Sequence, residues 1–103
     1  MQNKVKEFNK IKNVSLKPMS PESRLMDIVS EVGELSKEVL KNTDYGTKAF
    51  SVSEDYIMEY GDVLYSLLSL ADETGIDSNE ALDKVLDKYR KRLLSKGDIG
   101  SGR

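Results

Sequence analysis

Apolar residues recur at helical spacing through much of the chain. Between Ser20 and Lys41 they follow one another at intervals of three and four residues: Leu25, Ile28, Val32, Leu35 and Val39. Residues 54–74 carry a broader apolar arc, which covers about half of a helix circumference. The first segment has Val5 and Phe8 on the side that also holds Ile11 or Lys12. No segment combines the alternation and turn residues typical of strands, so the pattern predicts an all-α fold.

Start and stop signals place the ends of four helices. The starts are marked by capping residues: Ser20 before Pro21, Ser53 before Glu54 and Asp55, and Asp77 or Ser78. Gly75 ends the third helix. We therefore predict four helices, over residues 1–13, 21–41, 54–74 and 78–95, with a loop at 42–52. They would form one four-helix bundle-like domain over residues 1–96, followed by a flexible tail at 97–103.

Composition narrows the possible chemistry. The 103 residues include no Cys and no His, which excludes a disulfide scaffold, thiol catalysis, the usual zinc sites and catalytic triads built on His. The net charge is −2, but residues 21–83 hold four basic and fifteen acidic residues, while both ends are basic. An acidic centre between basic ends disfavours nucleic-acid binding and suits a site that joins cations to phosphates.

Two features of the sequence bear on location. The most apolar window, Val63 to Ala71, is interrupted by Ser66 and Ser69 and is too short to span a membrane. The Lys-rich start has no apolar core and no small-residue cleavage site, so it does not resemble a secretory signal. We therefore expect a cytoplasmic protein without a membrane partner.

Carboxylates line one side of each central helix. On the second helix they lie beside the apolar stripe: Asp27, Glu31, Glu34 and Glu38. On the third helix they share one face: Asp55, Glu59, Asp62 and Glu73. Glu31-Val-Gly-Glu34-Leu and Glu59-Tyr-Gly-Asp62-Val also match each other at a separation of 28 residues. The matched glycines, Gly33 and Gly61, favour a close approach between helices.

Carboxylates gathered beside an apolar stripe repel one another unless they take up a proton or a cation. Without His or Cys the ligand atoms are oxygens, which favours Mg²⁺ or Mn²⁺. Mg²⁺ often shares its coordination with substrate phosphates, so such a centre suits a diphosphate or triphosphate. The alternative is an ordinary solvated helix face, on which Glu34 and Glu38 pair with Lys37 or Lys41.

The paired motif over Glu31, Glu34, Glu59 and Asp62 resembles the signature of the MazG-like all-α nucleoside triphosphate pyrophosphohydrolases. The resemblance covers residues 20–93 and includes the stretches Tyr60-Gly-Asp-Val-Leu-Tyr-Ser-Leu-Leu and Asp87-Lys-Tyr-Arg-Lys-Arg-Leu. It implies a helical-bundle hydrolase, usually oligomeric, that cleaves a nucleoside triphosphate to the monophosphate and pyrophosphate with Mg²⁺. It also implies that the four motif carboxylates ligate the metal.

This reaction needs a proton acceptor and cations that hold the phosphates. Glu38, one turn beyond Glu34, is the candidate catalytic base, or a group that supports the ligands. The candidate phosphate-binding residues are basic side chains of the second and fourth helices: Lys37, Lys88, Lys91 and Arg92.

The broad apolar arc of residues 54–74 exceeds what one small chain can cover, which predicts a homodimer or homotetramer whose sites are completed by neighbouring chains. A second hypothesis is a non-catalytic oligomeric scaffold or regulator, whose acidic face binds a metal or a basic partner. Magnesium-dependent release of pyrophosphate from nucleotides distinguishes the two hypotheses.

Overall fold

The computed structural model describes residues 1–15 and 18–96, which contain four helices. These are α1 (Gln2–Ser15), α2 (Pro21–Asn42), α3 (Glu54–Thr74) and α4 (Ser78–Lys96). The described residues contain no strand, so the all-α prediction is confirmed, and each helix begins and ends within two residues of its expected bounds. The predicted tail at 97–103 lies outside the described residues, and the extent of the domain stays a prediction.

Capping side chains fix the helix starts that the sequence predicts. The hydroxyl groups of Ser20 and Ser53 each accept a hydrogen bond from a backbone N–H in the first turn of α2 and α3. Asp77, rather than Ser78, caps α4, because its Oδ1 accepts hydrogen bonds from two backbone N–H groups of the first turn.

No helix in the described part of the chain has the length and apolarity needed to cross a membrane.

A short elbow joins α3 to α4. Gly75 has a φ of 78°, and the backbone N–H of Ile76 donates to the carbonyl of Ala71 at 3.0 Å, which is a glycine-type helix end. The Gln2 side chain donates to the carbonyl of Ile76 at 2.9 Å and accepts from the backbone N–H of Ser78 at 2.8 Å. Contacts from both α3 and α1 therefore fix the direction in which α4 leaves.

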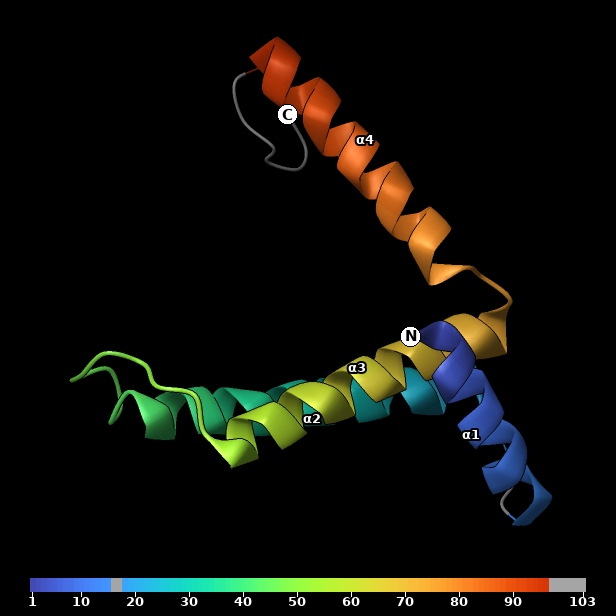
Figure 1. Cartoon of the computed structure of the whole chain (residues 1–103), viewed down its shortest axis with the longest axis horizontal. Helices are drawn as coiled ribbons and strands as arrows, with labels where there is room; N and C mark the ends of the chain where they lie inside the picture. The colour runs from blue at the N-terminus through green and yellow to red at the C-terminus, as the bar shows by residue number, and fades with distance from the viewer. Residues whose placement is uncertain (16–17, 97–103) are drawn as a thin grey trace.

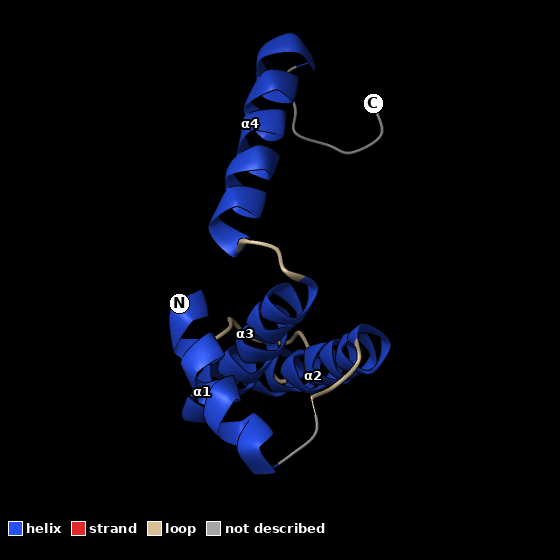
Figure 2. Ribbon diagram, turned by 90° about the vertical axis from the view of Figure 1, so that its right-hand side faces the viewer, coloured by secondary structure: helices blue, strands red, loops and turns tan. Residues whose placement is uncertain are grey.

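The central unit is an antiparallel pair of long helices, α2 and α3, with α1 packed across the end of α3 (Figure 1). Polar contacts fix the pairing of α2 with α3, in the order Arg24 with Glu73, Asp27 with Ser66, and Asn42 with Ser53. α4 projects away from this unit (Figures 1 and 2). The bundle-like prediction therefore holds only in part, because the four helices of one chain do not close into a bundle.

The buried core is small and partly polar. Its buried apolar residues are Val5, Leu68 and Ala71, and its buried polar residues are Asn9, Arg24, Ser66 and Ser69. Asn9 of α1 donates to the hydroxyl of Ser69 at 3.1 Å and accepts from the hydroxyl of Tyr65 at 2.6 Å. Hydrogen bonds therefore join α1 to α3 where the sequence suggests apolar contact.

Of the residues grouped on one side of the first helix only Val5 is buried, and the expected close helix approach at the glycines is wrong for the single chain. Phe8 and Ile11 are 55% and 73% exposed, because Val5 and Asn9 form the buried face of α1. Gly33 and Gly61 do not mark a close helix approach, since a Cβ atom at either position would lie more than 4 Å from other described atoms. Both glycines are exposed, and Gly61 lines a groove with Val5 of α1 and Leu68 of α3.

The apolar stripe of α2 is also incompletely covered. Its residues Leu25, Val32 and Val39 are 53%, 44% and 39% exposed. The polar pairs that join α2 to α3 instead place Arg24 and Asp27, at the edge of the acidic stripe, in the contact between the two helices. Apolar surface is therefore left open on the outside of the helix pair.

Arg24 is the main buried charge of the fold. It is 2% exposed, and its guanidinium donates two hydrogen bonds, at 3.1 and 3.0 Å, to the carboxylate of Glu73. It also lies over the ring of Tyr65, at 5.7 Å from the centroid. The hydrogen bonds to Glu73, partly opposed by burial, raise the pKa of Arg24 further, so Arg24 stays a cation in the contact between α2 and α3.

We predict that Arg24→Met lowers the free energy of unfolding by about 3–5 kcal/mol, because it leaves the carboxylate of Glu73 without its partner. The matched control is Lys10→Ala, which removes an exposed ion pair with Glu7 and should cost less than about 1 kcal/mol. Urea unfolding followed by circular dichroism measures both variants. Equal stability of the Arg24 variant and the wild type would show that the pair does not hold the helices together.

Candidate metal centre

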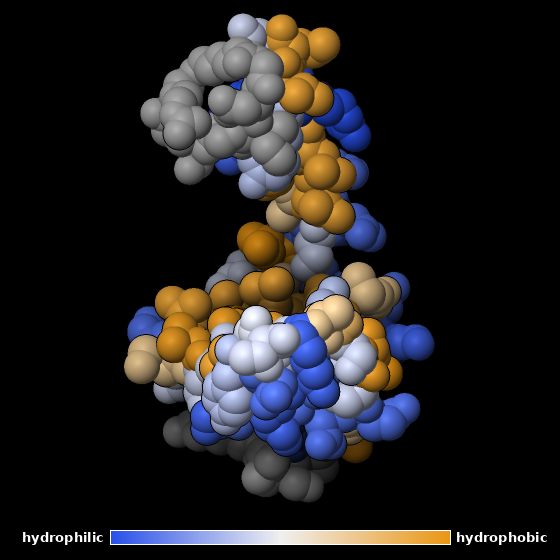
Figure 3. Space-filling model, turned by 90° about the vertical axis from the view of Figure 1, so that its left-hand side faces the viewer, coloured by the Kyte–Doolittle hydropathy of each residue, from blue (hydrophilic) through white to orange (hydrophobic). Residues whose placement is uncertain are grey.

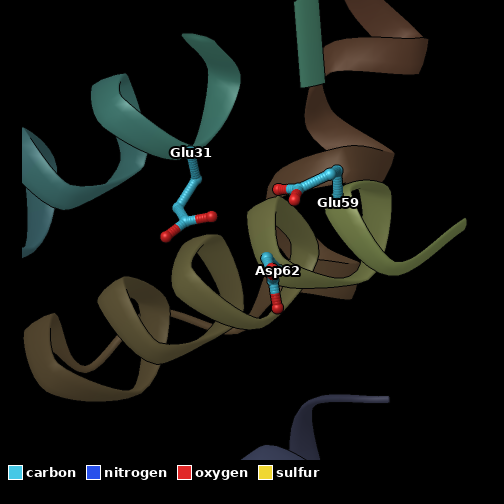
Figure 4. A group of neighbouring side chains, drawn as sticks. All are labelled: Glu31, Glu59 and Asp62. Atoms are coloured by element: carbon cyan, nitrogen blue, oxygen red, sulfur yellow. The ribbon is translucent and has the colours of Figure 1, made fainter. Parts of the chain in front are cut away.

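Three of the four predicted metal ligands come together between α2 and α3. Carboxylate oxygens of Glu31, Glu59 and Asp62 all lie within 4.8 Å of one another. Figure 4 shows Glu31 extending from α2 toward the turn of α3 that carries Glu59 and Asp62. The cluster forms because Glu59 and Asp62 are three residues apart on one helix, and the antiparallel pairing places Glu31 opposite them.

The fourth predicted ligand, Glu34, is not part of this cluster. Its side chain is 51% exposed, and a carboxylate oxygen lies 3.4 Å from Nζ of Lys37. Glu34 nevertheless lies close enough to raise the pKa of both Glu31 and Glu59 through its charge. Glu34 therefore lies beside the three grouped carboxylates and does not join them in this conformation.

Partial burial and mutual repulsion raise the pKa of two cluster carboxylates. Burial is the largest cause for Glu31 and Glu59, and the charge of Asp62 is the next for both. Asp27 and Asp55, each one turn before a cluster glutamate, add to the effect on Glu31 and Glu59 respectively. The site therefore concentrates negative charge that a bound cation would offset.

The donor set fits a hard divalent cation. All three groups are carboxylates, which suit Mg²⁺ or Mn²⁺, and none is held in a salt bridge in the described residues. The three oxygens lie up to 4.8 Å apart, so the side chains would have to move closer together to hold one ion. An octahedral ion would have remaining positions for water and phosphate oxygens.

The predicted catalytic base, Glu38, lies next to the cluster. Its side chain is only 13% exposed, and a carboxylate oxygen lies 3.4 Å from Nζ of Lys41. The charge of Glu38 contributes to the raised pKa of Glu59. Glu38 is thus near the centre, with its own counter-ion on the solvent side.

The structure separates the predicted phosphate-binding cations into two groups. Lys37 lies beside the centre on α2, and its side chain is 71% exposed. Lys88, Lys91 and Arg92 are on α4, which projects away from the α2–α3 pair of the same chain. Lys88 lies over the ring of Tyr89, and Lys91 pairs with Asp87 at 3.0 Å. One chain therefore does not bring its α4 cations to its own carboxylate cluster.

The structure also reveals polar residues near the centre that the sequence pattern does not single out. Ser66 is buried on α3, and its hydroxyl donates to Oδ2 of Asp27 at 3.0 Å. Arg24 approaches the same oxygen at 3.7 Å. The signal available in the sequence is their spacing, since Ser66 lies one turn from Asp62 and Arg24 lies one turn from Asp27.

Comparison with known proteins identifies the family of the chain. Residues 19–94 match the MazG nucleotide pyrophosphohydrolase domain. The chain is also similar to the uncharacterized protein YpjD of Bacillus subtilis (strain 168), with 38% identity over 76 residues, which are 71% of this chain and 67% of that protein. No solved structure matches the chain. The matched region contains all four motif carboxylates and both central helices, and the chain belongs to the MazG nucleotide pyrophosphohydrolase domain family.

Proposed function

We propose that this chain hydrolyses a nucleoside triphosphate to the nucleoside monophosphate and pyrophosphate, with Mg²⁺ or Mn²⁺ as cofactor. The observation that carries the proposal is the cluster of Glu31, Glu59 and Asp62 inside a MazG domain. Three carboxylates that form no salt bridge with any described residue suit a cation that also binds phosphate oxygens.

In this proposal Glu31, Glu59 and Asp62 hold the cation, with Glu34 reaching it after a change of rotamer. The bound ion supplies charge neutralisation for the phosphates and lowers the pKa of a water molecule. Glu38 accepts the proton of the attacking water. As the water oxygen bonds to the α-phosphorus, the bond from that phosphorus to the bridging oxygen breaks, and pyrophosphate leaves with the bond's electron pair.

Lys37 and the α4 cations bind the triphosphate in this scheme. Lys37 can reach the centre by leaving Glu34, to which it is only loosely paired at 3.4 Å. We propose that Lys88, Lys91 and Arg92 come from α4 of a second copy. Opposite charge supports this arrangement, because α4 is basic and the α2–α3 face is acidic.

Exposed apolar surface supports the same assembly. Leu82, Leu86 and Leu93 lie along one side of α4 and are 55%, 37% and 55% exposed. Figure 3 shows hydrophobic side chains along α4 and on the side of the helix pair that faces it. A groove of about 320 Å³ at the elbow is lined mainly by apolar residues, including Leu67 and Leu70. Helices in proteins draw most of their stability from packing of an apolar face, so α4 would gain from such a surface.

The alternative is a non-catalytic scaffold or regulator whose acidic face binds a metal. The exposed apolar surface fits it equally well. It differs in predicting no cleavage of nucleotides.

We predict that the wild type releases pyrophosphate from at least one common or damaged nucleoside triphosphate with Mg²⁺ or Mn²⁺. Glu59→Gln or Asp62→Asn should lower turnover by more than about a hundredfold, because loss of a residue that only supports a metal ligand typically costs about tenfold to a hundredfold. The fold should survive, because each substitution removes one repelling charge. Coupled pyrophosphate detection and thermal melts measure the two effects.

The matched control for these variants is Glu54→Gln, an exposed position at the start of α3 outside the cluster, which should keep wild-type turnover. Wild-type rates in Glu59→Gln or Asp62→Asn would remove the assignment of these ligands. Complete absence of pyrophosphate release across the panel would favour the scaffold.

We predict opposite pH responses for the metal-free and metal-loaded protein. The raised pKa of Glu31 and Glu59 means that the folded apo protein binds protons more tightly than the unfolded chain, so these groups stabilise it at low pH. That contribution to stability is lost as the pH rises from the ordinary glutamate pKa of 4.5 through the raised pKa of Glu31 and Glu59. Stabilisation by Mg²⁺ should increase over the same range, because protons compete with the ion.

Thermal melts with and without Mg²⁺ between acidic and neutral pH test this response. The double variant Glu31→Gln/Glu59→Gln is the reference, and it should lose the Mg²⁺ effect. A Mg²⁺-induced shift that is the same at all pH values would contradict the prediction.

We predict that the wild type is a dimer or larger by light scattering, and that Leu82→Glu and Leu86→Glu dissociate it and lower turnover. A charge on the apolar side of α4 would be buried in the assembly at high cost. The control Leu94→Glu lies off this side and is 88% exposed, so it should keep the assembly. A monomeric and active wild type would exclude completion of the site by a second copy.

A further inference from the structure

Asp27 and Ser66 form the polar pair next to the metal centre. Asp27 lies one turn before Glu31 on α2, and Ser66 lies one turn after Asp62 on α3. The hydroxyl of Ser66 donates to Oδ2 of Asp27 at 3.0 Å. Asp27 and Ser66 therefore face each other across the helix pair, one turn along from Glu31 and Asp62.

Buried partners hold one oxygen of Asp27. Ser66 and Arg24 are 3% and 2% exposed, and both approach Oδ2, at 3.0 and 3.7 Å. Arg24 is itself fixed by its two hydrogen bonds to Glu73. Within the described residues Oδ1 of Asp27 has no hydrogen-bond partner, and the side chain is 37% exposed. Asp27 thus has one oxygen anchored and one accessible to water.

Asp27 lies at a distance suited to indirect contact with a cation. Asp27 is not one of the carboxylates whose oxygens lie within 4.8 Å of one another, and its Cβ atom lies one helical turn, about 5–6 Å, from that of Glu31. Its charge still acts on Glu31, whose pKa it helps to raise. Mg²⁺ and Mn²⁺ commonly keep several water molecules in proteins, which can donate hydrogen bonds to a nearby carboxylate.

We propose that Asp27 is a positioning residue of the cation centre, held by Arg24 and Ser66 through Oδ2 and accepting hydrogen bonds through Oδ1 from water that the ion keeps. It strengthens cation binding without joining the ligands directly. The inference rests on the proposed function only in taking Glu31, Glu59 and Asp62 as a cation centre.

The sequence supplies a matched control. Asp55 precedes Glu59 by four residues, as Asp27 precedes Glu31, and the two aspartates are 28 residues apart like the rest of the repeated motif. Asp55 also acts on the pKa of its glutamate through its charge. It is exposed, however, and has no hydrogen bond or ion pair to a described residue. Asp55→Asn therefore removes the same charge from a side chain that no described residue holds in place.

The experiment measures Mn²⁺ affinity by electron paramagnetic resonance of the free ion, with no nucleotide present, in the full-length wild type and three variants. Asp27→Asn should weaken the affinity by about tenfold to a hundredfold, the usual effect of losing a group that supports metal ligands. Ser66→Ala, which keeps the charge and removes one anchor, should produce a smaller loss. The loss of Mn²⁺ affinity in Asp55→Asn should be clearly smaller than the loss in Asp27→Asn. A thermal melt of each variant shows that binding is measured on folded protein.

Equal losses in Asp27→Asn and Asp55→Asn would overturn the inference, because net charge alone would explain both. So would a lowered melting temperature of Asp27→Asn with unchanged Mn²⁺ affinity, which would show a purely structural role. A wild type that binds Mn²⁺ but cleaves no triphosphate would refute the proposed function and leave the role of Asp27 intact. A wild type that binds no Mn²⁺ would refute both.

Discussion

Repulsion among carboxylates that face one another between α2 and α3 is the constraint that the rest of the structure has to satisfy. Left to themselves, Glu31, Glu59 and Asp62 would push the two helices apart. Arg24 with Glu73 at one end, and Asn42 with Ser53 at the other, hold the helices in one antiparallel register. The strongest of these contacts is a buried two-bond ion pair, so the crowded charges are kept together by stronger contacts outside the cluster.

The crowded carboxylates favour nearby positive charge, and the basic side chains beside them in the described residues already pair with other carboxylates. The cluster has Lys37 and Lys41 on its solvent side, and these are already shared with Glu34 and Glu38. The basic residues of α4 lie on an arm that points away. In the proposed assembly, the exposed leucines of α4 and the open apolar positions of α2 are covered by hydrophobic contact with a second copy, which also brings basic residues to the acidic face.

Local signals predicted the helices and most of the cluster, whereas contacts between helices could not be derived from them. Ser20, Ser53 and Gly75 act within a few residues, so the helix ends follow directly from the sequence. Glu31, Glu59 and Asp62 followed from a motif repeated on two helices. The buried polar residues were missed, because Asn9 and Arg24 look like surface residues until their partners on α3 are known. The close helix approach predicted from the glycines was wrong for the same reason, since helical spacing does not specify which side of a helix meets a neighbour.

The all-carboxylate donor set has a consequence for metal selection in the cell. Imidazole and thiolate groups are the ligands by which proteins bind zinc and copper most tightly, and this chain has neither. In the proposed cation centre, the donor set therefore lacks the groups that favour zinc and copper. The chain also has no thiol that peroxide could oxidise, so oxidants that disable cysteine-dependent proteins would leave its carboxylates chemically unchanged.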